Sequence, residues 1–139
     1  MKKKLRKRTN YFTLMEIMIV VAIIGLLMAI VGPMAAKAFF KGKAAAAKMQ
    51  LRAFESSIMD YQIDTGSYPK SLKDLLVNSG SKKWDGPYIS KKSIPKDPWG
   101  NDYVYRIDPN IPQGYVIICY GADGAPGGTK KAKDITNND

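Results

Sequence analysis

The ionisable residue with the most unusual setting in this sequence is Glu16, because an uncharged apolar run follows it directly, from Ile17 to Val31. A carboxylate within a membrane or an apolar core costs several kcal/mol unless it finds a partner. Two interpretations are open. Glu16 lies at the level of the lipid headgroups and serves only the positive end of a helix dipole, or it pairs with a charged group of another molecule.

Few residues in this sequence could carry out catalysis. The sequence contains no histidine, the usual general base for a Ser or Cys nucleophile and the commonest metal ligand. The one cysteine, Cys119, lies in the apolar run 115–120 and cannot form an internal disulfide. Free cysteines are among the most buried residues, so we expect a buried strand thiol. The composition therefore argues against an enzyme.

The net charge of +10 comes from 22 Lys and Arg against 12 Asp and Glu, and six of these basic residues lie in the first eight positions. From Tyr11 onward, 16 basic residues remain against 12 acidic ones, so the body of the chain is only mildly basic. No stripe of alternating aromatic and basic residues accompanies this charge. We therefore expect no nucleic acid partner.

The apolar run and its flanks, 12–14 and 32–36, approach the roughly 20 residues that a membrane-spanning helix needs. Basic flanks stay on the cytoplasmic side, so the sequence predicts a single pass with its C-terminal part across the membrane. A secretory signal peptide removed near Ala36 is the alternative. Pro33 and the adjacent Gly32 interrupt the span and would permit a kink or local melting.

Beyond the span, apolar residues recur at alternating spacings of four and three, which predicts that the helix continues to Thr65-Gly66. They are Phe40, Ala44, Ala47, Leu51, Phe54, Ile58 and Tyr61. A Ser71-x-x-Asp74 capping box predicts a short second helix. Two β-rich segments, 102–107 and 115–120, predict a hairpin, and the chain after Gly121 is predicted to be a loop. The fold class is α+β.

The segment Phe12-Thr-Leu-Met-Glu16 and the apolar run after it resemble the processing and assembly motif of type IV pilins and pseudopilins. The resemblance implies a type IV pilin-like fold, a long N-terminal helix packed on a small antiparallel sheet with a C-terminal loop. It also implies three parts: a basic leader (1–11), a transmembrane and polymerisation helix (12–36) and a periplasmic globular domain (37–139).

In that family a prepilin peptidase cuts the bond before the phenylalanine, here between Tyr11 and Phe12, and the new N-terminus at Phe12 is methylated. The glutamate, here Glu16, pairs with the N-terminal amine of a neighbouring subunit, and Pro33 also belongs to the assembly segment. The family normally has glycine where this sequence has Tyr11.

Three further segments, 61–69, 94–103 and 120–127, resemble the signatures of the major pseudopilin of type II secretion systems. The second contains Pro98-Trp99-Gly100, for which we expect a structural role, with Trp99 covering a small core. The resemblance implies a non-enzymatic subunit that polymerises into a helical periplasmic filament and drives protein export across the outer membrane. The alternative within the superfamily is a type IV pilin or a DNA-uptake (competence) pseudopilin.

The partners implied by this resemblance are other copies of the chain, the prepilin peptidase, minor pseudopilins, and an inner-membrane assembly platform with its ATPase. The implied location is the inner membrane, crossed once, with the C-terminal domain in the periplasm. The resemblance also implies a calcium ion bound by the Tyr120 carbonyl, Asp123 and Asp134. Where relatives tend to carry acidic residues before that last aspartate, this sequence has Lys130, Lys131 and Lys133. A solvated turn in which Asp123 bonds its own backbone is the alternative.

Overall fold

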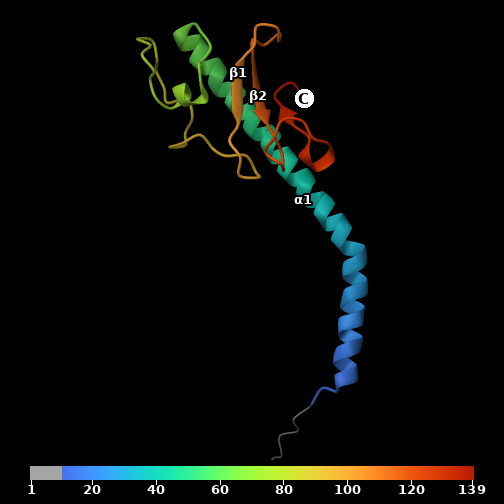
Figure 1. Ribbon diagram of the computed structural model, residues 1–139. Coiled ribbons are helices and arrows are strands. Elements are labelled where there is room, and N and C mark those ends of the chain that lie inside the picture. Colours follow the sequence, from blue (N-terminus) through green and yellow to red (C-terminus); the bar gives the residue numbers. More distant parts are fainter. Residues whose placement is uncertain (1–10) are drawn as a thin grey trace, which may run out of the picture. The chain divides into compact units, whose positions relative to one another are not determined.

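The computed structural model describes residues 11–139, so the predicted leader, apart from Tyr11, lies outside the described residues. By its internal contacts the chain divides into two compact units between Ala38 and Phe39. A single helix, α1 (Leu14–Thr65, 52 residues), contributes to both units (Figure 1).

The first part of α1 is long and apolar enough to cross a membrane, and its side chains are largely exposed within the chain itself. The helix continues through Gly32 and Pro33 without a break, so the local melting allowed by the sequence does not occur. The missing N–H of a proline removes only one bond of the helical ladder, and the turns on either side are intact. The predicted C-terminal end is confirmed: the Gly66 N–H bonds the Gln62 carbonyl at 2.8 Å, and Gly66 has φ +78.

The second unit contains a three-stranded antiparallel sheet with the strand order β1-β2-β3. The strands are β1 (Val104–Ile107), β2 (Tyr115–Cys119) and β3 (Ile135–Thr136), and two short 3-10 helices, η1 (Leu72–Leu75) and η2 (Lys130–Ala132), complete the elements. In the register of the sheet, Val104 lies opposite Ile118 and Cys119 opposite Ile135. This architecture confirms the predicted fold class.

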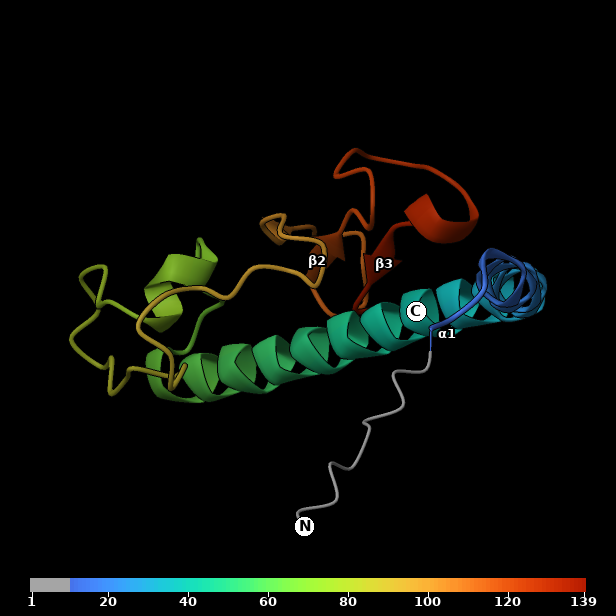
Figure 2. The same cartoon turned by 90° about the horizontal axis from the view of Figure 1, so that it is seen from below.

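The core of this unit lies between the second part of α1 and the sheet. The predicted apolar stripe supplies five buried helix residues: Ala47, Leu51, Phe54, Ile58 and Tyr61. Ile117 and Cys119 from β2 and Ile135 from β3 pack in the same cluster, since alternate residues of a strand share one face. Figure 2 shows the sheet and the loops gathered on one side of this part of the helix.

Three secondary-structure predictions need correction. The first strand begins at Val104 rather than Asp102, whose exposed side chain forms an ion pair with Lys96. The second strand ends at Cys119, one residue early. The predicted short helix is a single 3-10 turn, in which the Asp74 carboxylate accepts bonds from the Lys70 and Ser71 N–H groups at 2.8 and 3.0 Å.

The C-terminal segment is more ordered than a loop, because one side chain fastens it to the sheet. The Ile117 N–H donates to the Asn137 Oδ1 at 2.9 Å, and the Asn137 N–H donates to the Ile117 carbonyl at 3.2 Å. The Asn137 Nδ2 donates to Glu55 on α1 and to Gln113. These bonds hold β3 in place.

Candidate functional site

The predicted assembly residue Glu16 lies in the first turn of α1 and forms a capping box with Thr13. The Glu16 Oε2 accepts bonds from the Thr13 N–H at 2.8 Å and from the Thr13 hydroxyl at 3.0 Å. In return, the Glu16 N–H donates to the Thr13 Oγ1 at 3.2 Å. Sequence reasoning missed Thr13, although Thr-x-x-Glu before an apolar run is a recognised helix-start signal.

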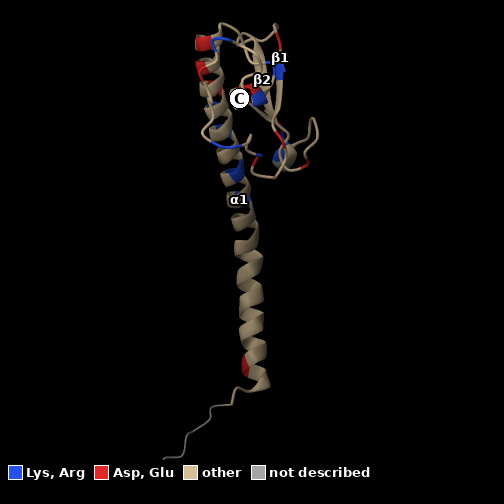
Figure 3. Cartoon of the chain, turned by 90° about the vertical axis from the view of Figure 1, so that its left-hand side faces the viewer, with Lys and Arg blue, Asp and Glu red and all other residues tan. Residues whose placement is uncertain are grey.

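These bonds bear on the free-energy cost of placing the Glu16 carboxylate near lipid. Its hydrogen bonds are partly satisfied by its own helix start, but both donors are neutral, and no ion pair among residues 11–139 compensates its negative charge. The following residues, 17–36, carry no charge (Figure 3). The site can therefore accept a positive group from outside the chain without breaking the fold.

The peptide bond between Tyr11 and Phe12 precedes the first helical residue, Leu14. The two side chains are 86% and 78% exposed, respectively. A bond outside regular secondary structure and flanked by exposed side chains is the kind of segment that proteases cut. The structure thus places the two predicted cleavage residues in an accessible position, whereas Pro33 lies inside the helix.

Two of the predicted calcium residues, Tyr120 and Asp134, adjoin the point where the two ends of the C-terminal loop meet. A Cβ added to Gly121 would lie 3.1 Å from the Lys133 carbonyl, so the segment after Tyr120 lies against the segment before Asp134. The Asn101 Nδ2 fixes the Gly121 carbonyl at 2.9 Å. The loop thus brings the Tyr120 and Asp134 ends of the predicted ligand set close together.

The two aspartates of the loop differ. The Asp123 Oδ1 accepts a bond from the Ala125 N–H at 3.3 Å, which is the local turn expected under the alternative interpretation. The Asp134 Oδ2 accepts a bond from the Gly127 N–H at 2.8 Å, whereas its Oδ1 is buried without a hydrogen-bond partner among the described residues. A buried carboxylate oxygen without a partner needs an explanation, and a hard cation coordinated by oxygens is one.

The nearby lysines do not exclude a calcium ion, but the side chains alone do not form a complete ligand set. Within residues 11–139 no three acidic, histidine or cysteine side chains cluster as metal ligands, so backbone carbonyls would have to complete the set. Of the added lysines, Lys130 is exposed, and the Lys133 ammonium lies 4.0 Å from the Asp139 carboxylate. Carboxylate and carbonyl oxygens are the ligands that calcium takes, so the types of residue at these positions fit the ion.

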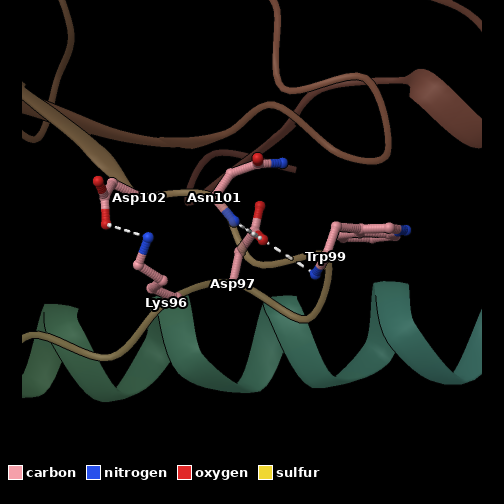
Figure 4. Close-up of polar contacts among 5 residues, drawn as sticks. All are labelled: Lys96, Asp97, Trp99, Asn101 and Asp102. Carbon is pink, nitrogen blue, oxygen red and sulfur yellow. Dashed lines mark hydrogen bonds and ion pairs between the residues drawn. The ribbon is translucent and has the colours of Figure 1, made fainter.

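The Pro-Trp-Gly motif forms a turn around one buried carboxylate, that of Asp97, which is 5% exposed. Its Oδ1 accepts bonds from the Trp99 N–H at 2.9 Å and the Asn101 N–H at 2.8 Å (Figure 4). Its Oδ2 accepts a bond from the Cys119 thiol at 3.2 Å. Trp99 packs against the core, as predicted. The motif is structural.

Cys119 is fully buried, which confirms the sequence prediction. Burial raises the pKa of its thiol to about 12, and the neighbouring Asp97 carboxylate acts in the same direction. A thiol that stays protonated is a poor nucleophile. Cys119 therefore belongs to the core rather than to a reactive site.

A long N-terminal helix with an apolar first part and a first-turn glutamate, packed on a small antiparallel sheet, defines a type IV pilin-like protein. Residues 35–138 match the family model described as type II secretion system (T2SS) protein G. The chain therefore belongs to the T2SS protein G family.

Named relatives and a solved structure support the same assignment. The T2SS core protein G of Xanthomonas campestris is 38% identical over 124 residues, which cover 88% of this chain and 85% of that protein. The protein of the same name from Pseudomonas aeruginosa is 36% identical, covering 96% of this chain and 98% of that protein. The crystal structure of the major pseudopilin of enterohaemorrhagic Escherichia coli is 31% identical, covers 70% of this chain and 87% of that one, and has a TM-score of 0.55.

These comparisons confirm the family predicted from the sequence motifs and favour a T2SS major pseudopilin over the alternative of a type IV pilin or competence pseudopilin. The family is one of structural subunits. The long apolar helix of this chain is consistent with a single-pass membrane anchor.

Proposed function

We propose that this chain is stored in the inner membrane as a single-pass protein and polymerises into a helical periplasmic pseudopilus that drives protein export. The observation that carries the proposal is the Glu16 carboxylate, which has no ion-pair partner among residues 11–139, at the start of an apolar helix whose side chains are exposed. Lipid covers those side chains in the stored subunit, and the helices of neighbouring copies cover them in the filament.

Glu16 supplies the register of this assembly. After cleavage between Tyr11 and Phe12, the amine at Phe12 of one copy is a mobile positive group at the helix start. Pairing it with the Glu16 carboxylate of a neighbour compensates both charges in a low-dielectric core, where Coulomb interactions are strongest. Cleavage requires the prepilin peptidase, and assembly requires minor pseudopilins and the inner-membrane platform with its ATPase.

Two Glu16 variants test this step. Glu16→Ala should insert into the membrane normally but yield no filaments in sheared or extracted material viewed by electron microscopy. Glu16→Gln can still accept the bonds from Thr13 yet carries no charge, so it should also fail to polymerise. Normal filaments from Glu16→Gln would show that helix capping, rather than charge pairing, is what the carboxylate supplies.

Processing has a separate test in the intact mass of the protein recovered from membranes. We expect the loss of residues 1–11 and the addition of one methyl group at Phe12. A Tyr11→Gly variant, which restores the residue normal for the family, is the matched control and should be processed at least as fast. An uncut chain, or one cut near Ala36, would contradict the assignment.

We also propose that the C-terminal loop binds one calcium ion through the Tyr120 carbonyl, Asp123 and Asp134. The orphaned Oδ1 of Asp134 supports this proposal. Calcium would supply a positive charge that holds the two ends of the loop together. Adding calcium should raise the melting temperature of the wild-type chain and of Asp102→Asn, an exposed control, but not that of Asp134→Asn. No calcium-dependent shift in the wild-type chain would favour the solvated turn.

A further inference from the structure

One face of α1 in the unit that begins at Phe39 is left uncovered. Figure 2 shows the sheet and loops on one side of this part of the helix and none on the other. Small and apolar residues lie about half a turn away from the core stripe: Gly42, Ala45, Met49, Ser56 and Ile63. Met49 and Ile63 are each 72% exposed, and a Cβ added at Gly42 would meet nothing within 4 Å. We call these five residues the outer face.

The large apolar side chains of the outer face, Met49 and Ile63, lie 14 residues apart, about 21 Å along the axis, with the small residue Ser56 midway between them. The spacings of three, four and seven keep the outer face in line along the helix. Glycine, alanine and serine let another helix approach closely, and methionine adapts its shape to a partner. The outer face is therefore suited to another helix.

The two edges of the outer face carry opposite charges. Lys48 and Arg52 lie on one edge, and Asp60 and Asp64 lie on the other, about 120° around the helix. Both acidic residues follow their basic counterparts by 12 residues, which is about 18 Å along the axis. Figure 3 shows basic residues on the middle of α1 and acidic ones toward its C-terminal end.

These charges are available for a partner. Within residues 11–139, Lys48, Arg52 and Asp60 have no ion-pair partner, since the ion pairs found there join Lys96 to Asp102 and Lys133 to Asp139. Asp64 accepts one bond from the Tyr88 hydroxyl at 2.7 Å through Oδ2. Each edge carries two charges four residues apart, so the basic edge of one copy can face the acidic edge of another copy. This requires the two copies to be shifted relative to each other along the helix axis.

We propose that the outer face binds a second copy of this chain, whose acidic edge lies against the basic edge of the first with a shift of about 18 Å. The proposal rests on the proposed function, because a common membrane anchor makes all copies parallel. Parallel copies then meet through unlike edges, so each copy leaves one edge open. Such a heterologous contact continues into a filament instead of closing as a dimer.

An anionic lipid surface is a less suitable occupant. Lipid headgroups would attract Lys48 and Arg52 but repel Asp60 and Asp64 on the other edge of the same face. A second copy places its acidic edge against the basic edge, and a further copy can place its basic edge against the acidic edge. Like charges brought together in a protein contact are strongly unfavourable, so reversing one edge should oppose assembly.

Charge reversal in the full-length chain tests the pairing, with filament yield measured by sedimentation and electron microscopy. Lys48→Glu and Asp60→Lys should each lower the yield by about tenfold or more. The chain carrying both changes restores opposite charges between neighbours and should recover to within about threefold of the wild-type yield. Lys82→Glu changes the net charge as Lys48→Glu does, but on an exposed loop, and should assemble normally.

Oxidative cross-linking in membranes tests the geometry. A chain with both Lys48→Cys and Asp60→Cys should give a ladder of multimers, and either change alone should not, because Cys119 is buried. Covalent dimers from a single-cysteine chain would show a symmetric contact and overturn the proposal, as would failure of the double reversal to restore filaments.

The failure of this inference can be told apart from failure of the proposed function. If the wild-type chain forms filaments, Glu16→Ala does not, and Lys48→Glu assembles as well as Lys82→Glu, the outer-face contact is wrong and the pseudopilin function stands. If Lys48→Glu lowers the amount of chain that sediments with vesicles of anionic lipid but leaves the filament yield unchanged, the basic edge binds lipid instead. If the wild-type chain forms no filaments, both proposals fall.

Discussion

Replacing Asp97 by alanine should destabilise the globular unit more than any exposed substitution, because one carboxylate organises the turn 97–101. The side chain accepts two backbone N–H bonds, from Trp99 and Asn101, and a thiol bond from Cys119. Alanine leaves both N–H groups without an acceptor in a part-buried turn. An unsatisfied buried donor costs about 1–3 kcal/mol, and water will reach a part-buried group, so we expect a loss of about 3 kcal/mol in total.

Asp97→Asn separates the contribution of geometry from that of charge. The amide oxygen can keep both backbone bonds, but neutral hydrogen bonds are about half as strong as those of a carboxylate. The amide nitrogen would face the Cys119 thiol in place of an acceptor oxygen. We therefore expect Asp97→Asn to cost about 1 to 2 kcal/mol, clearly less than alanine.

The assay is urea unfolding of the full-length chain in detergent, followed by tryptophan fluorescence, since Trp99 lies in the turn itself. Asp102→Asn is the control: its side chain is 84% exposed, its ion pair with Lys96 spans 3.7 Å, and it should cost under about 0.5 kcal/mol. Equal losses for Asp97→Ala and Asp97→Asn would refute the role given to the acceptor oxygen. A loss below about 1 kcal/mol for Asp97→Ala would show that the turn does not depend on the carboxylate.

Three further predictions concern Asn137, Cys119 and Tyr115. Asn137→Ala removes the bonds to Ile117, Glu55 and Gln113, so it should lower the free energy of unfolding in urea by about 2 kcal/mol. It should also speed proteolysis of the C-terminal segment. Unchanged proteolysis would show that other contacts hold β3. Cys119 should resist alkylation at pH 8 in the native chain and react in urea, because it is buried and its pKa is raised to about 12; equal rates in both states would contradict its burial. Burial, with Glu55 and Tyr68 as smaller causes, raises the pKa of Tyr115 to about 12. Its contribution to stability should therefore be complete below about pH 10, the pKa of an unfolded tyrosine, and be lost as the pH rises through 12, which urea midpoints at successive pH values will measure.

Residues whose roles depend on local periodicity could be predicted from the sequence. The stripe from Ala47 to Tyr61 is a helical repeat, and Gly66 is a helix-ending residue, so the course of α1 followed from neighbours within four positions. Glu16 and Cys119 were identified in the same way, as a charged or thiol residue inside an apolar run. Local pattern was sufficient for these features.

Features that depend on distant partners could not be predicted in this way. Strand β3 has two residues and exists because Asn137 reaches Ile117, 20 positions away in the sequence. Asp97 looked like a turn residue, but its bond to Cys119 spans 22 positions. The orphaned oxygen of Asp134 is visible only once the loop is folded. From composition alone, such residues would be predicted only to lie in polar loops.

Under the proposed function, Thr13 would link the storage of the subunit to its assembly. In the single chain, its backbone N–H and its hydroxyl both donate to the Glu16 carboxylate, which orients that group at the start of the helix. These neutral donors lower the cost of placing the carboxylate near lipid, but they cannot neutralise it. An incoming amine therefore gains the Coulomb interaction that Thr13 leaves available, and it finds the acceptor already oriented. If the proposed assembly is right, the same capping box that makes the isolated subunit tolerable in a membrane leaves a defined driving force for its exit into a filament.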